Sequence, residues 1–388
     1  MKRIAAIALV LALGAVLGFA DETTEIYKVL YQQAEGLSQK YAAVLNLVGL
    51  NDKSTAPVLA SALDELLATQ KNYQASVDQE LYSQTVRLLC KALGDYKYEA
   101  SASSLWAVAQ DVADPLTGAE AIMAIGKIRD LDYAERIALK LRDLNLQPTA
   151  DRDAGEKLAY GCIVALDKLK DARGFSPVFF ATDAWYSQRV RQQASQSLPN
   201  IADDPTDAIK TILGSETPDR QLRALMAETA SKATSDRKIE VAILALNLGH
   251  LNVPHDKAEA KTLADLRKLA LRSFIAYKAT GADPVDGCSS SYSNGIDDEE
   301  RLFALAALGV NGSDPAASAL RDILLKLNED QSAGVTDETR NRMAKAAIDA
   351  ASSSKNKLVK PALVAVSINE KWSGGVIAAA QVALKAMQ

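Results

Sequence analysis

The chain has 388 residues, with 44 basic and 49 acidic side chains and a formal net charge of −5. Hydrophobic residues make up 48% of it, but aromatic residues only 5%, so a large core has to be filled mainly by Ala and Leu. An acidic chain without a basic stripe does not fit a nucleic-acid-binding protein, whose affinity comes largely from neutralising phosphates with Lys and Arg.

The first 20 residues have the three parts of a secretory signal peptide. Lys2 and Arg3 form a positive start, residues 4–17 are apolar, and Gly18-Phe19-Ala20 is a small-x-small cleavage site. The alternative, a permanent anchor, is disfavoured because the apolar stretch is shorter than the roughly 20 residues that a spanning helix needs. The short Ala/Leu/Val stretch is typical of bacteria. We expect cleavage after Ala20, a periplasmic or secreted mature protein, and membrane contact only through the signal peptide of the precursor.

Residues 21–98 carry apolar side chains at helical spacing, for example Ile26, Leu30 and Val44. Few segments anywhere in the chain show the alternation of β-branched and aromatic residues that is typical of strands. We therefore expect an all-α protein with an N-terminal helical cap region over 21–98.

From residue 99 to the C-terminus, helix-start signals recur at intervals of roughly 30 to 45 residues, which is the loose period of a helical repeat. Asp-Pro pairs supply an acidic cap and a preset φ angle at Asp114-Pro115, Asp204-Pro205 and Asp314-Pro315. Because a single helix pair cannot bury its own apolar stripe, such pairs are expected to stack and share a core. The sequence thus predicts one repeat array over 99–388.

The most regular repeat runs from Asp297 to Gly309 (DDEERLFALAALG) and continues through Asp314-Pro315 into an apolar-periodic run over 316–327. Acidic residues open this helix, and Leu302, Leu305, Ala306 and Leu308 fall on one face that we expect to be buried. This stretch resembles the second helix of a HEAT repeat of the phycobilisome-lyase type. The resemblance implies a right-handed α-solenoid of stacked antiparallel helix pairs, a fold that usually binds other macromolecules.

Residues 281–296 are rich in Gly and Ser, and we expect a long loop there, which is often functional or mobile. Cys288 lies in this segment, either as a reduced thiol or as an intermolecular disulfide in an oxidising compartment. Cys90 and Cys162 fall within apolar helical runs and are expected to be buried and inert.

Sequence signals for chemistry are sparse. The only histidines, His250 and His255, flank Asn252-Val253-Pro254 and are expected in a loop, where they do not share a helical face as a metal pair would. Gly-rich phosphate loops, G-x-S-x-G elbows and H-E-x-x-H motifs do not occur in the sequence. We therefore expect no cofactor, no metal and no enzymatic activity.

Two functions compete at this point. The first is a non-catalytic scaffold that binds a protein or envelope component, and not nucleic acid, through the concave face formed by successive second helices. The second, implied by the resemblance alone, is a small-ligand-binding protein or a lyase-type enzyme that attaches chromophores to cysteines. For Trp185 and Tyr186 the alternative to binding is packing on Phe179 and Phe180. Aromatic and Arg residues are typical interface anchors, and the candidates are Trp185, Tyr186, Arg189, Arg191 and Tyr292.

Overall fold

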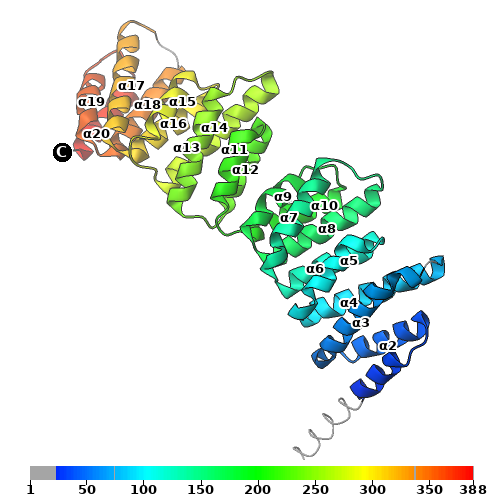
Figure 1. The fold of residues 1–388 in the computed structure, drawn as a ribbon. Coiled ribbons are helices and arrows are strands. Elements are labelled where there is room, and N and C mark those ends of the chain that lie inside the picture. Colours follow the sequence, from blue (N-terminus) through cyan, green and yellow to red (C-terminus); the bar gives the residue numbers. More distant parts are fainter. Residues whose placement is uncertain (1–22, 74, 336–337, 388) are drawn as a thin grey trace, which may run out of the picture. The chain divides into compact units, whose positions relative to one another are not determined.

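The computed structural model describes residues 23–73, 75–335 and 338–387, and every regular element among them is a helix (Figure 1). The prediction of an all-α protein is confirmed. The expected signal peptide lies outside the described residues. No helix in the described part of the chain is long and apolar enough to cross a membrane.

The chain divides into two compact units, the first ending at Ala202 and the second beginning at Asp203. In the first unit, residues 23–32 are helical. The labelled helices that follow are α2 (Leu37–Gly49), α3 (Ala56–Thr69), α4 (Ser76–Tyr96), α5 (Ala102–Asp111), α6 (Pro115–Ile128), α7 (Ala134–Leu146), α8 (Arg152–Leu169), α9 (Phe175–Ala181) and α10 (Gln188–Ile201).

The second unit is built in the same way. Its helices are α11 (Thr206–Ser215), α12 (Pro218–Ala230), α13 (Ser235–Leu251), α14 (Lys257–Tyr277), α15 (Val285–Asn294), α16 (Asp298–Asn311), α17 (Asp314–Ser332), α18 (Glu338–Ser354), α19 (Lys360–Ser367) and α20 (Gly374–Ala386).

Within each unit, neighbouring helices pack as sequential pairs, for example α5 with α6 and α13 with α14. Even-numbered helices also pack on the next even-numbered helix, and in the second unit each odd-numbered helix packs on the next odd-numbered one. The pairs therefore form layers that share one core, as expected when no single pair can bury its apolar stripe.

Glycines let the even-numbered helices approach closely. A Cβ added to Gly126 of α6 would lie 2.5 Å from Cα of Ala165 in α8, and one added to Gly309 of α16 would lie 2.7 Å from Cα of Ala350 in α18. These distances are shorter than any van der Waals contact, so any larger residue would have to push the helices apart.

Four of the turns that lead from an even-numbered helix to the next odd-numbered one share a short motif. A residue with positive φ ends the helix, at Asn51, Arg129, Lys170 and Lys355, with φ between 52° and 68°. The next residue is Asp or Asn, whose side chain accepts a hydrogen bond from the backbone N–H two positions on and starts a 3-10 turn. These residues are Asp52 (2.9 Å), Asp130 (3.0 Å), Asp171 (2.9 Å) and Asn356 (3.0 Å).

The Asp171→Ala variant should unfold about 1 kcal/mol more easily at neutral pH, because it loses this cap. Bonds to the Arg173 side chain, then to its backbone N–H, hold the pKa of Asp171 below its usual range. Because the pKa of Asp171 is lower in the folded protein, its carboxylate stabilises the fold at pH values above the unfolded pKa of about 3.9. This stabilisation is lost as the pH falls through the folded pKa. Urea titrations should therefore show the gap between wild type and variant shrinking in acid. A gap that stayed constant down to pH 2.5 would contradict this, and exposed Asp132→Ala is the control.

Two expectations for the second unit are wrong, the loop over 281–296 and the loop position of His250. Residues 281–296 are not one long loop, because α15 occupies most of them. Of the two alternatives for Cys288 the structure favours the reduced thiol, because the side chain is only 2% exposed and burial raises the pKa of the thiol to about 12. His250 does not lie in a loop but in the last turn of α13. The loop was predicted because Ser and Gly are common in loops. Here their small size lets α15 pack closely on α13: a Cβ on Gly287 would lie 2.6 Å from the side chain of Leu246.

The expected helices over residues 297–327 are confirmed, and the expected buried face is confirmed in part. Asp297 caps α16 by accepting a hydrogen bond from the N–H of Glu300 at 2.9 Å, and Leu305 and Leu308 are fully buried. Leu302 is only partly buried and Ala306 is exposed. The run over 316–327 lies in α17, and Pro315 stands in its first turn. Cys90 and Cys162 are also buried, as expected.

Candidate functional site

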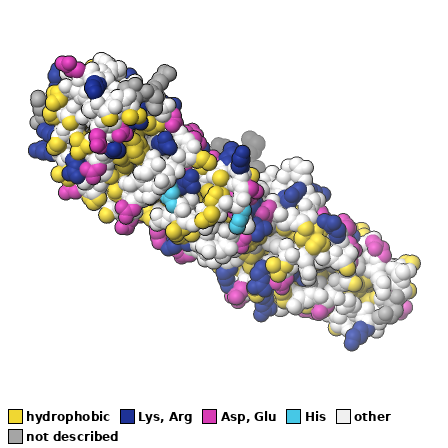
Figure 2. Space-filling view, turned by 90° about the horizontal axis from the view of Figure 1, so that it is seen from above, with side chains coloured by type: hydrophobic (Ala, Val, Ile, Leu, Met, Phe, Trp, Pro, Cys, Tyr) yellow, Lys and Arg dark blue, Asp and Glu magenta, His cyan; other side chains and the backbone are white. Residues whose placement is uncertain are grey.

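The turns that join each odd-numbered helix to the following even-numbered one form an edge of the second unit, which we call the turn edge. Exposed aliphatic side chains recur along it, one or two at each of four successive turns. They are Leu251 (75% exposed), Val253 (82%), Ile296 (57%), Val335 (50%) and Ile368 (73%). In the described part of the second unit, seven large hydrophobic residues are at least half exposed, and five of these seven lie on the turn edge. Figure 2 shows hydrophobic side chains among carboxylates and basic groups in the second unit, at the left.

A cleft of about 490 Å³ opens at the turn edge, between the α15–α16 turn and the α17–α18 turn. Its wall includes three cations and two carboxylates as well as aromatic and aliphatic groups. The lining residues that the argument uses are Tyr292, Arg301, Asp322, Lys326, Asp330 and Arg340.

Arg301 stands in the first turn of α16 and is partly buried. Its Nη2 donates one long hydrogen bond, 3.3 Å, to the carbonyl of Gly295. Its Nε is buried and has no hydrogen-bond partner, and none of the described carboxylates forms an ion pair with it. Burying part of a cation without a counter-ion is unfavourable, and Arg301 differs from the paired Arg340 and Lys326 of the same wall in having none.

Tyr292 lies near the end of α15 and is partly buried in the cleft wall. Burial raises the pKa of its phenol, while the positive charges of Arg301 and Arg340 act in the opposite direction. The hydroxyl therefore stays protonated at neutral pH and can donate a hydrogen bond into the cleft.

The second basic group of the cleft is already paired. Arg340 Nη1 lies 2.8 Å from Asp330 Oδ2, and Lys326 Nζ lies 3.2 Å from Asp330 Oδ1. Hydrogen bonds from Arg340 and then Lys326 lower the pKa of the Asp330 carboxyl, which stays ionised. Asp322 is paired in the same way with Arg321, at 2.9 Å.

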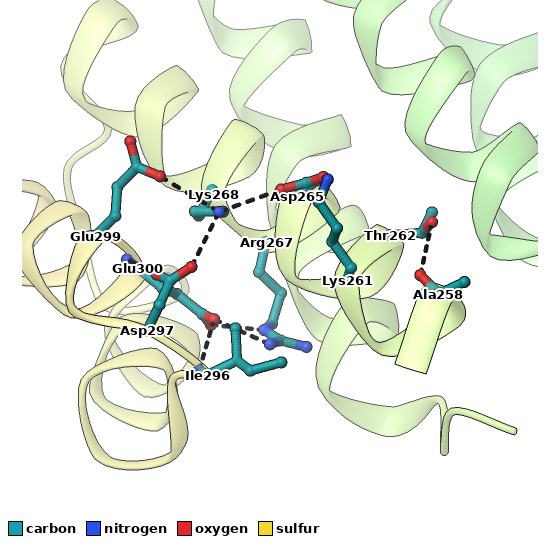
Figure 3. Close-up of polar contacts among 10 residues, drawn as sticks. All are labelled: Ala258, Lys261, Thr262, Asp265, Arg267, Lys268, Ile296, Asp297, Glu299 and Glu300. Atoms are coloured by element: carbon teal, nitrogen blue, oxygen red, sulfur yellow. Dashed lines mark hydrogen bonds and ion pairs between the residues drawn. The ribbon is translucent and has the colours of Figure 1, made fainter. Parts of the chain in front are cut away.

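A buried ion pair between Arg267 and Glu300 fixes the start of α16 (Figure 3). Arg301 is the next residue of that helix. The Arg267 Nε and Nη2 atoms of α14 donate to the two carboxylate oxygens of Glu300, at 2.6 and 2.9 Å. The Glu300 side chain is fully buried and that of Arg267 is 12% exposed. Arg267 also donates to the carbonyl of Gly249 at 2.8 Å, and Glu300 accepts from the N–H of Ile296 at 3.2 Å.

Lys268, the next residue of α14, gathers three carboxylates beside this pair (Figure 3). Its Nζ lies 3.2 Å from Asp265, 3.2 Å from Asp297 and 3.3 Å from Glu299. Burial lowers the pKa of Lys268, but the three hydrogen bonds outweigh it and raise the pKa overall. The cluster ties α14 to the N-terminus of α16, which is a structural role.

His250 and Ser291 form a hydrogen bond of 2.9 Å between α13 and α15. Burial, and then the charge of Arg267, lower the pKa of His250, so the ring is neutral at physiological pH. Ser291 is fully buried, so no substrate could reach its hydroxyl without movement of a helix. The pair joins two helices and does not have the exposed nucleophile of a hydrolase.

The five candidate anchors do not form one site. Tyr186 is 3% exposed and its hydroxyl donates to Asn145 at 2.9 Å, while Trp185 donates from Nε1 to the Leu144 carbonyl at 2.8 Å. These two rings lie 4.6 Å apart and pack within the first unit. Arg189 lies over the ring of Tyr160, at 5.4 Å, and Arg191 is exposed. Among the candidates, Tyr292 is the one that lines the cleft of the second unit.

The first unit has a cleft in the corresponding position, between the α3–α4 and α5–α6 turns. Its volume is about 620 Å³, and its wall includes Tyr73, Tyr82 and Asp114. The rings of Tyr73 and Tyr82 lie 5.5 Å apart. Exposed aliphatic residues also occur at turns of this unit, at Val77 (77% exposed) and Leu146 (78%).

Sequence reasoning missed Arg301 as a candidate because an arginine in the first turn of a repeat helix does not stand out by type or position. Only the structure shows that three of the four acidic residues before it are engaged elsewhere: Asp297 as a cap, Glu299 by Lys268 and Glu300 by Arg267.

Over the described residues, His, Cys, Asp and Glu side chains do not gather in any group of three that could hold a metal ion. Comparison with models of known protein families gives no match, and no curated protein is significantly similar in sequence.

Proposed function

We propose that the protein is a non-catalytic helical-repeat scaffold, a HEAT-like α-solenoid whose mature form works in a periplasm or outside the cell. It holds a protein or envelope partner. The observation that carries the proposal is the turn edge of the second unit, where exposed aliphatic side chains recur at successive turns around a polar cleft.

Spacing is the first support for this surface. One or two aliphatic side chains at each turn make a row whose members are about one helix diameter apart, roughly 10 Å. A partner segment lying along the edge would contact several of them in turn. Isolated exposed aliphatic residues need no explanation, but a repeated series marks an interaction site.

We place the partner on the turn edge, and not on the concave face through which a HEAT-like array is expected to bind. Met226 of α12 and Val382 of α20 are the large hydrophobic residues on even-numbered helices of the described second unit that are at least half exposed. The turn edge offers more apolar surface together with a cleft, so we place the partner there.

In-cell crosslinking of the tagged protein, followed by purification from the envelope fraction and mass spectrometry, tests the proposal. We expect one abundant and reproducible partner that is absent from an untagged control. Recovery of the bait alone would contradict the scaffold and would favour the small-ligand alternative.

A further inference from the structure

We infer that the cleft between Tyr292 and Arg301 is a binding site for a carboxylate, supplied by the partner. The inference rests on the proposed function for the source of the carboxylate, but the chemistry of the cleft can be tested without that partner.

Arg301 carries the first step of the inference. The other cations of the wall, Arg340 and Lys326, share the carboxylate of Asp330. Arg301 is the lining cation of the described cleft that forms no ion pair, and its single side-chain hydrogen bond is long. A planar guanidinium matches a carboxylate with two parallel N–H···O bonds, and such charge-assisted bonds are stronger than neutral ones.

Tyr292 supplies the second donor. Its ring forms part of the same wall as Arg301, and the charge of Arg301 acts on its phenol. A phenol that remains protonated donates to an anion and cannot repel it. Together the two side chains present donors from α15 and α16, whose junction is fixed by the Arg267–Glu300 pair.

The charge balance of the wall favours a singly charged anion. Among the described lining residues three cations face two carboxylates, and Arg301 is the cation that neither carboxylate pairs with. Asp322 and Asp330 would repel the second negative charge of a phosphate dianion more than the single charge of a carboxylate. We therefore assign the site to a carboxylate.

The experiment is an NMR titration of the whole mature protein, observing arginine Nε–H signals, with the Arg301 signal assigned by its loss in Arg301→Gln. Three probes are used: N-acetylglycine for a chain terminus, N-acetylglutamic acid α-amide for an acidic side chain, and inorganic phosphate. The neutral control is N-acetylglutamine amide. We expect a saturable shift of the Arg301 signal with a carboxylate probe, at a Kd on the order of 1 mM. The probe that binds more tightly identifies the source as a terminus or a side chain.

Variants sharpen the test through other signals of the cleft, such as the Arg340 Nε–H. Arg301→Gln should weaken binding about tenfold, and Tyr292→Phe about threefold, because each removes a donor to a charged group. Arg342→Gln, an exposed arginine of α18 outside the cleft wall, should leave binding unchanged. Equal binding of the neutral control, tighter binding of phosphate, or unchanged affinity in Arg301→Gln would overturn the inference. A crosslinked partner without carboxylate binding would refute this site alone, and carboxylate binding without any partner would refute the scaffold alone.

Discussion

Gly126→Val should lower the free energy of unfolding of the first unit by about 3 kcal/mol or more, because the new side chain overpacks the contact between α6 and α8. A side chain at this position of α6 would collide with the backbone of α8, because a Cβ added to Gly126 would lie only 2.5 Å from the Cα of Ala165. Backbone cannot rotate away as a side chain can, so the helices must separate and lose contacts along their whole length. Overpacking of this kind costs typically about 1 to 3 kcal/mol, and more when backbone has to move. Urea unfolding gives the change in midpoint, and hydrogen exchange shows that it arises in α6 and α8.

Gly49→Val in the same unit is the matched control. Gly49 is the last residue of α2, and a Cβ added there would have no atom within 4 Å. Its stability should stay within about 0.5 kcal/mol of the wild type. If both variants lost the same free energy of unfolding, the proposed role of Gly126 in the close approach of α6 and α8 would be wrong.

Glu300→Ala should destabilise the second unit by about 3 to 5 kcal/mol, because it leaves Arg267 buried without its counter-ion. The variant also removes the acceptor for the Ile296 N–H. Hydrogen exchange should report faster opening of α14 and α16, which the pair joins.

The apolar double variant Arg267→Met with Glu300→Leu should recover most of the loss, because replacing both charges removes the unpaired one. Glu299→Ala is the control: its carboxylate is 63% exposed and 3.3 Å from Lys268, and such surface pairs contribute little. A loss as large for Glu299→Ala as for Glu300→Ala would contradict a role for burial.

The helices were predictable from sequence where local signals agree with packing. Asp297 and the acidic residues after it start a helix on their own, and the spacing of Leu305 and Leu308 identifies its buried face. The 281–296 segment was not predictable in this way, because Gly287 and Ser291 are small for tertiary reasons that a local reading takes as loop signals.

Three dipeptides at helix ends also recur from repeat to repeat. The dipeptides Asn51-Asp52, Arg129-Asp130 and Lys170-Asp171 each end a helix in the left-handed region and begin a capped 3-10 turn. Lys and Arg are unusual at positive φ, so propensity alone would not have suggested these helix ends.

The candidate site was less accessible to sequence reasoning. Tyr292 was identified by its residue type, but its neighbour Arg301 became informative only when Glu300 and Asp330 were seen to pair with other cations. Trp185 and Tyr186 have the composition of interface anchors, yet their polar atoms bond to Leu144 and Asn145. Residue type cannot distinguish an anchor from a core residue, because both need large aromatic surfaces.

Site-specific photo-crosslinking in cells tests the central claim most directly. A photoreactive residue replaces Ile296 or Ile368 on the turn edge, Leu358 on the opposite edge, or Val382 on the even-numbered layer, all of them exposed in the second unit. We predict the same crosslinked partner from positions 296 and 368 and none from 358. Equal yield from 358, or a partner captured from 382 but from neither turn-edge position, would contradict the assignment of partner binding to the turn edge.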